Sequence, residues 1–154
     1  MTLLRIPYCQ ISTSQLPFQK HKNLPFLKVG LQNHNSQAVK LVAFIDTGAQ
    51  WCLFSKSYAK ILGIHDYKSG VPILISGIGG NVPQNTAYFH DLTLAIFNDQ
   101  KHPNYKDAVK IDTKVGFLEK DIGVAGILGV YGFLDHFKFI ANIPQQYFEI
   151  EYLF

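Results

Sequence analysis

Phe44-Ile45-Asp46-Thr47-Gly48-Ala49 is the stretch that decides the fold: an apolar strand runs into one carboxylate and then into a turn. Residues 41–45 form a continuous apolar run without charge, which is typical of a strand buried on both faces. Burial disfavours an ionised carboxylate unless a partner or hydrogen-bond donors stabilise it, so Asp46 is costly at this position without a purpose. Gly48 lets the chain turn sharply and lets another backbone or a substrate approach the carboxyl group.

Asp-Thr-Gly alone is explained equally well by an ordinary core strand that ends in a turn. Two further stretches change this balance. Residues 75–80 read ISGIGG, and residues 127–129 read ILG and are followed by Phe133 and Leu134. In this order, the three stretches resemble the active-site motif, the glycine-rich flap and the hydrophobic-hydrophobic-Gly element of retroviral-type, or retropepsin-like, aspartic proteases. The chain looks closest to the bacterial single-lobe members of that family.

The resemblance implies a mostly β protein, with a single-lobe retropepsin-like closed β fold and one or two short helices. It covers about residues 26–139. The length of 154 residues predicts a single domain, residues 1–154. Terminal strands in residues 1–10 and 147–154 are expected at a dimer interface, because such strands usually join the two subunits of the viral enzymes.

Composition excludes several other classes of protein. Charged residues make up 16% and aromatic residues 14% of the chain, a mixture that favours sheet and argues against disorder. The net charge of +3 is spread without a basic run, so no nucleic-acid surface is expected. The sequence shows neither an apolar run long enough to span a membrane nor a signal peptide, so we expect a cytoplasmic protein without a membrane partner. Cys9 and Cys52 are expected as reduced thiols.

Alternating apolar residues predict most of the strands. An edge strand is expected over residues 3–10, because Pro7 lacks the N–H group that a central strand needs. Two hairpins are expected, one from residues 26–31 and 38–45, the other from 71–75 and 86–89 around the glycine-dense tip. Further strands are expected at residues 51–54, 92–96, 109–117, 138–141 and 147–154.

Two short helices are expected. Ser55 is a plausible N-cap for residues 56–62, and Gly63 is a plausible end. The second helix is expected to start within residues 130–135, where apolar residues recur at helical spacing but glycines keep any helix short. The helical spacing is that of Leu128, Tyr131, Leu134 and Phe137.

Hydrolysis of a peptide bond by carboxylates needs two of them sharing one water molecule: one accepts its proton and the other donates to the carbonyl oxygen. This chain carries Asp-Thr-Gly once. A second copy of the chain is the economical source of the missing carboxylate, because a two-fold axis beside Gly48 brings two Asp46 side chains face to face. The resemblance implies the same arrangement, since its retroviral-type members are single-lobe homodimers.

The resemblance also implies a role for each motif residue. Asp46 is the catalytic residue, the hydroxyl of Thr47 braces the pair across the dimer axis, and Gly48 and Ala49 lie along an extended peptide or protein substrate. The substrate-binding flap consists of Gly77, Ile78, Gly79 and Gly80, and the support beneath the active-site loop consists of Ile127, Leu128 and Gly129. No metal or other cofactor is expected. Gln50 follows Ala49 where viral relatives have a carboxylate, and residues 98–106 look like an insertion.

Rival interpretations remain open. His65-Asp66 and His90-Asp91 suggest metal or triad fragments, although adjacent residues of a strand point to opposite faces. Cys52 suggests a nucleophile, but its apolar surroundings favour a buried inert thiol. The main rival is a non-catalytic peptide-binding or scaffold module that keeps the fold, because a groove with a flap also binds peptides without cutting them. Self-processing during maturation is a third possibility.

Overall fold

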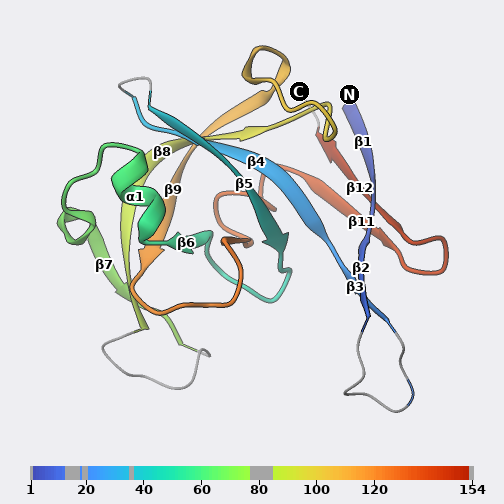
Figure 1. Cartoon of the computed structure of the whole chain (residues 1–154), viewed down its shortest axis with the longest axis horizontal. Helices are drawn as coiled ribbons and strands as arrows, with labels where there is room; N and C mark the ends of the chain where they lie inside the picture. Colours follow the sequence, from blue (N-terminus) through green and yellow to red (C-terminus); the bar gives the residue numbers. More distant parts are fainter. Residues whose placement is uncertain (1, 13–17, 19–20, 35–36, 77–84, 153–154) are drawn as a thin grey trace.

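The computed structural model describes residues 2–12, 18, 21–34, 37–76 and 85–152 (Figure 1). It confirms the mostly β fold, with one α-helix in the described residues. The strands are β1 (Thr2–Pro7), β2 (Cys9–Ser12), β3 (His21–Leu24), β4 (Phe26–Gln32), β5 (Ala38–Ile45), β6 (Leu53–Ser55), β7 (Val71–Leu74), β8 (Thr86–Ile96), β9 (Val109–Leu118), β10 (Gly126–Leu128), β11 (Lys138–Asn142) and β12 (Tyr147–Tyr152). The helix is α1 (Ser57–Ile61), and two 3-10 turns are η1 (Tyr67–Ser69) and η3 (Tyr105–Asp107).

The main sheet closes on itself. Its strand order is β4-β5-β10-β6-β9-β8-β7, and β4 also pairs with β8, so that six strands form a ring with β7 added outside. Both predicted hairpins are present, as the antiparallel pairs β4–β5 and β7–β8. The strands predicted at residues 86–89 and 92–96 are one strand, β8, which pairs with β7, β9 and β4 along its length.

The core fills the inside of this ring. Many of its side chains are fully buried, including Leu27, Leu31, Leu94 and Phe117. Each fully buried Leu or Phe side chain contributes about 1.5–3 kcal/mol relative to an exposed one. The core therefore fixes the register of the strands that carry the loop after β5.

The prediction that β5 is buried on both faces is wrong. Ala43 and Ile45 point into the core, whereas Val42 is 42% exposed and Phe44 is half-buried. The reason is that the closed sheet has one inner face, so alternate residues of β5 point outward even though the sequence is apolar throughout.

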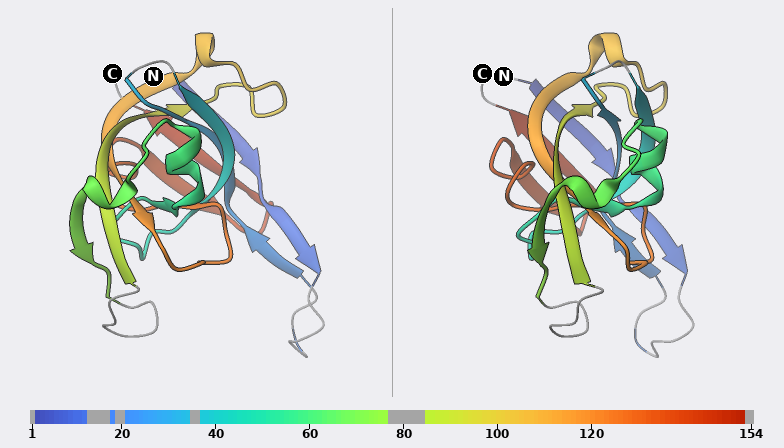
Figure 2. Two further views of the ribbon diagram at one scale, coloured as in Figure 1. Left: turned by 60° about the vertical axis from the view of Figure 1, so that its left-hand side comes forward. Right: turned by 90° about the vertical axis from the view of Figure 1, so that its left-hand side faces the viewer.

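A second sheet joins the two ends of the chain, in the order β1-β12-β11. β1 lies at its edge, as Pro7 predicts, and pairs antiparallel with β12 from Thr2↔Tyr152 to Pro7↔Tyr147. Arg5 and Glu149 face each other in this register and form an ion pair of 2.6 Å. β2 and β3 form a separate two-stranded arm that extends away from the closed sheet (Figures 1 and 2).

The predicted helix after β6 is present but shorter than expected, as α1. Ser55 is not its N-cap: Ser55 ends β6, and Lys56 occupies the cap position without a side-chain hydrogen bond. Gly63 follows with a φ of 78°, which a residue without Cβ adopts readily. No helix among the described residues is long and apolar enough to cross a membrane.

The predicted helix at residues 130–135 is wrong, because this segment forms turns. Gly132 has a φ of 95°, which interrupts any right-handed helix. The N–H groups of Leu134 and Asp135 donate to the carbonyl oxygens of Gly129 and Val130, a spacing of five residues instead of the four of an α-helix. Leu128 and Phe137 are buried and Leu134 packs against the core, whereas Tyr131 is 43% exposed, so the spacing does not mark one buried face of a helix.

Replacement of Gly132 tests how far this turn depends on glycine. An alanine Cβ there is strained at positive φ and meets Thr113 Oγ1, so Gly132→Ala should lower the free energy of unfolding by about 2–5 kcal/mol. Gly123 is a matched control, because its φ is 75° but its Cβ position has no neighbour within 4 Å. Gly123→Ala should cost about 1–2 kcal/mol in urea denaturation. Equal losses in the two variants would show that the contact with Thr113 is unimportant.

Candidate active site

Asp46 occupies the first position after β5, where two hydrogen bonds hold the chain. Its N–H group donates to the carbonyl oxygen of Leu128 at 3.0 Å, and the N–H group of Ile45 donates to that of Pro25 at 3.0 Å. Leu128 belongs to β10, which lies between β5 and β6 and pairs parallel with β5. The start of the loop is thus fixed by a strand that is distant from it in the sequence.

The loop itself orients the carboxylate. The N–H group of Gly48 donates to Asp46 Oδ1 at 2.9 Å, and the N–H group of Ala49 donates to the Asp46 carbonyl oxygen at 3.1 Å. Asp46 is half-buried, whereas Thr47 and Gly48 at the tip of the turn are exposed. One carboxylate oxygen is therefore held by the backbone at the edge of an open surface.

The chain after β10 passes beneath this loop. The N–H group of Val130 donates to the Ala49 carbonyl oxygen at 2.8 Å, and that of Tyr131 donates to the Gln50 carbonyl oxygen at 2.9 Å. Gly129 lies so close to the loop that a Cβ there would be 2.7 Å from the Ala49 carbonyl oxygen. Only glycine fits at this crossing without displacing the backbone of the loop.

A cleft of about 340 Å³ lies in front of Asp46. It brings Asp46, Gly48, Ala49 and Ile127 together, whereas Thr47, Leu128 and Gly129 are outside its lining. Gly77, Ile78, Gly79 and Gly80 lie outside the described residues. The rest of the lining consists of Gln50, Trp51, Leu53, Leu74, Ile75 and Ser76. The sequence had already singled out Gln50, and Ile75 and Ser76 as the start of the flap motif, but not Trp51, Leu53 or Leu74.

Part of this missed set carried a usable signal. Leu74 leads directly into the flap motif that begins at Ile75, so its place in the cleft could have been inferred from the hairpin alone. Trp51 carried none, because its place in the cleft depends on ring contacts with Phe89 and Tyr131, which are distant in sequence.

Cys52 is a buried thiol and not a nucleophile. Its side chain has no exposed surface, and burial raises its pKa to about 12. The thiol donates to the carbonyl oxygen of Tyr131 at 3.5 Å. At neutral pH almost none of it is the thiolate that attacks an electrophile.

In each His-Asp pair the aspartate is bound to a residue other than its neighbouring histidine: Asp66 accepts from the N–H group of Lys68, and Asp91 pairs with Lys114. His90 Nε2 bonds to the carbonyl oxygen of Tyr67 at 2.7 Å, while Asp91 forms an ion pair of 2.6 Å with Lys114. The hydrogen bond from Lys114 holds the pKa of Asp91 below its usual value. Within the described residues, no group of three or more potential ligands could hold a metal ion.

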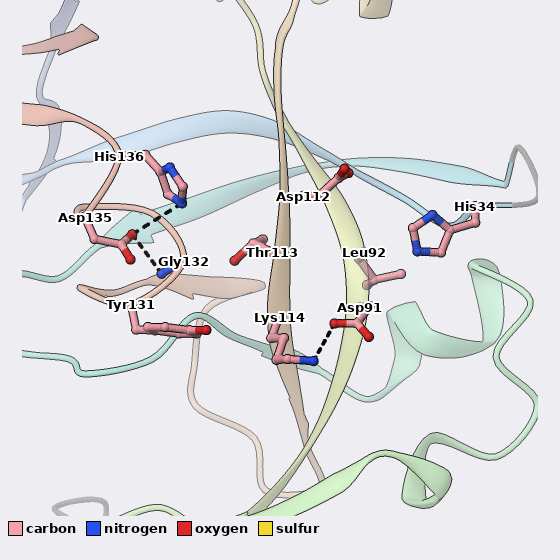
Figure 3. A pocket seen from close by; sticks show the side chains of 10 residues that line it. All are labelled: His34, Asp91, Leu92, Asp112, Thr113, Lys114, Tyr131, Gly132, Asp135 and His136. Atoms are coloured by element: carbon pink, nitrogen blue, oxygen red, sulfur yellow. Dashed lines mark hydrogen bonds and ion pairs between the residues drawn. The ribbon is translucent and has the colours of Figure 1, made fainter. Parts of the chain in front are cut away.

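Asp91 and Lys114 instead line a larger hollow of about 460 Å³ (Figure 3). Asp135 also lines it and accepts a hydrogen bond from the N–H group of Gly132 at 3.0 Å, with His136 Nε2 3.7 Å away. Its charged groups are largely paired with neighbours, and Asp46 is not part of its lining. Size alone therefore does not identify the candidate active site, and the smaller cleft is the one that contains Asp46.

Comparisons with known proteins identify the family and the fold of the chain. A family model described as aspartyl protease matches residues 33–131, more than half of the chain. Among solved structures, the chain is similar to a retropepsin-like aspartic protease from Rickettsia conorii. The TM-score is 0.60 and the identity 18%, over 98% of this chain and 91% of that chain. That likeness shows a shared fold. No curated protein matches the sequence.

The two thiols should differ sharply in reactivity. Cys9 is exposed and Cys52 is buried with a raised pKa, so one thiol per folded chain should react rapidly with a disulfide reagent at pH 8. The second should react only after unfolding in guanidinium chloride, as absorbance of the released thiolate will show. Cys9→Ser is the control and should abolish the rapid phase; rapid labelling of that variant would mean that Cys52 is accessible.

Proposed function

The chain belongs to the aspartyl protease family, and from that membership we propose that it is an aspartic endopeptidase whose two catalytic carboxylates are Asp46 of each subunit in a homodimer. The observation that carries this proposal is the placement of Asp46. The carboxylate is held by the N–H group of Gly48 at the edge of a cleft, on a loop whose tip is exposed.

In the proposed reaction, a water molecule lies between the two carboxyl groups. One Asp46, ionised, takes a proton from the water as its oxygen attacks the peptide carbonyl carbon. The other, protonated, donates its proton to the carbonyl oxygen, which gives a tetrahedral diol. The Asp46 that took the proton from water then donates it to the amide nitrogen as the C–N bond breaks, and the other Asp46 takes a proton from a diol hydroxyl. The products are a carboxylic acid and an amine, and the pair returns to its starting state. The pair shares one proton, because two like charges so close cannot both ionise easily.

The homodimer supplies what one chain lacks. Each chain carries a single Asp-Thr-Gly, and both Thr47 and Gly48 are exposed at the tip of the loop, where a second copy can approach. In the proposed dimer, the hydroxyl of Thr47 braces the pair across the axis. β1 and β11 are the edges of the terminal sheet, and β12 lies between them with both of its sides already paired. The two edge strands are therefore the candidates for the rest of the interface.

The proposed substrate is an extended peptide or protein segment. Gly48 and Ala49 line the cleft where its backbone would lie, and extended peptides commonly bind by adding a strand to such a surface. Leu74, Ile75 and Ser76 line the cleft from the strand that leads to the flap. The sequence-based expectation that Gly77, Ile78, Gly79 and Gly80 cover the substrate is part of this proposal.

Asp46→Asn should abolish peptide cleavage while leaving the protein folded. The asparagine oxygen can still accept from the N–H group of Gly48, so the loss is confined to the charge and the exchangeable proton. Asp66→Asn is the matched control, because Asp66 Oδ1 accepts from the N–H group of Lys68 at 3.0 Å in the same two-residue turn. Cleavage of a quenched-fluorescence peptide library should fall at least 1,000-fold only in Asp46→Asn, by analogy with loss of an essential acid-base group. Wild-type cleavage rates in that variant would end the assignment.

Dimerisation should accompany activity. Sedimentation velocity should show a concentration-dependent dimer, and a statine-type inhibitor that mimics the tetrahedral intermediate should shift the equilibrium toward it, because the inhibitor contacts both subunits. Specific activity should fall on dilution below the dissociation constant. A chain that stays monomeric and ignores the inhibitor would instead support the non-catalytic peptide-binding module.

A further inference from the structure

A second groove, of about 460 Å³, lies where β1 of the terminal sheet meets the closed sheet. Its lining comes from β1, from the loop of residues 98–101 that follows β8, and from the outward face of the β4–β5 hairpin. It shares no lining residue with the cleft that contains Asp46. The proposed reaction uses no part of this groove.

The backbone edge of β1 faces the groove. Four consecutive residues of the strand, 4–7, line it, although Leu4 and Ile6 are buried in the core and Arg5 and Pro7 are exposed. Because successive side chains of a strand point to opposite faces, a surface lined by four residues in a row runs along the backbone. β1 is also the edge strand of its sheet, and the described residues provide no strand partner on the side away from β12. The N–H and C=O groups of such an edge can pair with an added strand.

The opposite side of the groove is held in place by Gln100. Its side-chain oxygen accepts from the N–H group of Lys28 at 2.7 Å, and its side-chain nitrogen donates to the carbonyl oxygens of Lys28 at 3.0 Å and Phe97 at 2.9 Å. Gln100 thus satisfies the backbone groups of Lys28 as a neighbouring strand would. Because these bonds already fasten the loop to β4, a ligand does not pay the entropy of ordering it.

The surface between these two sides is largely apolar. Lys28 and Val42 are register partners, so their side chains lie on the same outward face of the hairpin. Val42 is 42% exposed, and Phe26, which lies on that face two residues before Lys28, is half-buried beside Phe44 at 5.9 Å between ring centroids. An apolar side chain placed over Val42 and Phe26 would remove their apolar surface from water.

The charges of the groove are mostly positive. Arg5, Lys28 and Lys101 line it together with one acid, Asp99. Arg5 is already paired with Glu149, and Asp99 accepts from the N–H group of Lys101 in its own turn. Lys28 and Lys101 take part in no ion pair among the described residues. Their two ammonium groups, beside an apolar surface, complement a ligand that is both apolar and acidic.

The chain itself shows what kind of strand β1 accepts. On its paired side β1 binds β12, which reads YFEIEY and alternates apolar with acidic side chains. Glu149 of β12 faces Arg5 and accepts from its guanidinium group at 2.6 Å. β12 of a second copy is not free to fill the groove, because β1 and β11 of its own chain pair with both of its sides. A separate peptide segment of similar chemistry is therefore the occupant that these contacts favour.

We propose that this groove binds an extended segment of another protein, in which apolar side chains alternate with acidic ones, by strand addition to β1. The backbone of the segment pairs with the free edge of β1. An apolar side chain packs on Val42 and Phe26, and an acidic one pairs with Lys28 or Lys101. This binding site is independent of the proposed reaction, and it leaves β11 as the free edge for the proposed homodimer.

Labelled peptides test the chemistry of the ligand. The probe is fluorescein-labelled Gly-Ile-Glu-Val-Glu-Ile-Gly, and its anisotropy is followed as Asp46→Asn protein is added, so that the peptide stays intact. A counterpart with Lys in place of Glu should bind about tenfold more weakly, because two attractions become repulsions. Two further versions carry N-methyl groups on alternate amides, one on the odd and one on the even positions. One of these should lose binding, since an added strand pairs through every second residue. Equal binding of both N-methylated versions and the parent peptide would overturn strand addition.

Charge reversals test the two lysines. Lys28→Glu and Lys101→Glu should each weaken binding of the probe about two- to thirtyfold, and the effect should shrink as salt is added. Lys110→Glu is the matched control, because Lys110 is exposed on β9, is in no ion pair among the described residues and does not line the groove. Unchanged binding in both groove variants would overturn the proposal.

Amide resonances locate the bound peptide. In ¹H–¹⁵N spectra of the full chain, residues of β1 and residues 98–101 should shift when the unlabelled probe binds, whereas Gly48, Ala49 and Ile127 should not. Shifts at the cleft alone would overturn the groove and leave the protease assignment standing. Shifts of β1 on dilution of the protein without peptide would mean that a second copy covers this edge, and would also overturn the proposal. A wild type that cuts no peptide but shows the expected shifts would support the groove and end the protease assignment.

Discussion

The hydrogen bond from the N–H group of Asp46 to the carbonyl oxygen of Leu128 is the constraint on which the site depends. It exists because β10, only three residues long, fits between β5 and β6 and completes the ring of strands there. The same strand leads into Gly129, whose missing side chain lets the next segment pass beneath the active-site loop. Closure of the sheet and the position of the Asp46 carboxylate therefore depend on the same contacts of β10. A substitution that disrupts these contacts would affect both.

Backbone hydrogen bonds and aromatic contacts, and no ion pairs among the described residues, hold the cleft in place. The ion pairs among the described residues, such as Arg5–Glu149, Lys56–Glu119 and Lys138–Glu151, involve no residue that lines the cleft. Exposed ion pairs contribute little and weaken further in salt, whereas buried backbone bonds do not. The architecture of the cleft is thus largely independent of ionic strength. None of the ion pairs among the described residues involves the carboxylate of Asp46.

Much of the fold could be predicted from the sequence, because hairpins and motif order are local signals. The alternation in residues 26–31 and 38–45 predicts β4–β5, and the glycine-dense tip predicts β7–β8. The two main errors, the helix expected to start within residues 130–135 and the burial of β5 on both faces, concern features that the surrounding structure determines. Gly132 turns the expected second helix into turns, and the inward curve of the sheet exposes Val42 of an apolar strand. At the site, Asp46 was evident from its motif, but Trp51 was not, because rings from residues 89 and 131 position it.

The pairing of β1 with β12 has a consequence for how the domain can be joined to other chains. Thr2 and Tyr152 are register partners, and both ends of the ribbon emerge together (Figure 1). Polypeptide fused ahead of Thr2 and polypeptide fused behind Tyr152 would leave the molecule from the same spot. A short linker could then join two copies in tandem. It could also connect the two ends of one copy, with new termini placed in a surface loop, without disrupting the sheet that β1 and β12 share.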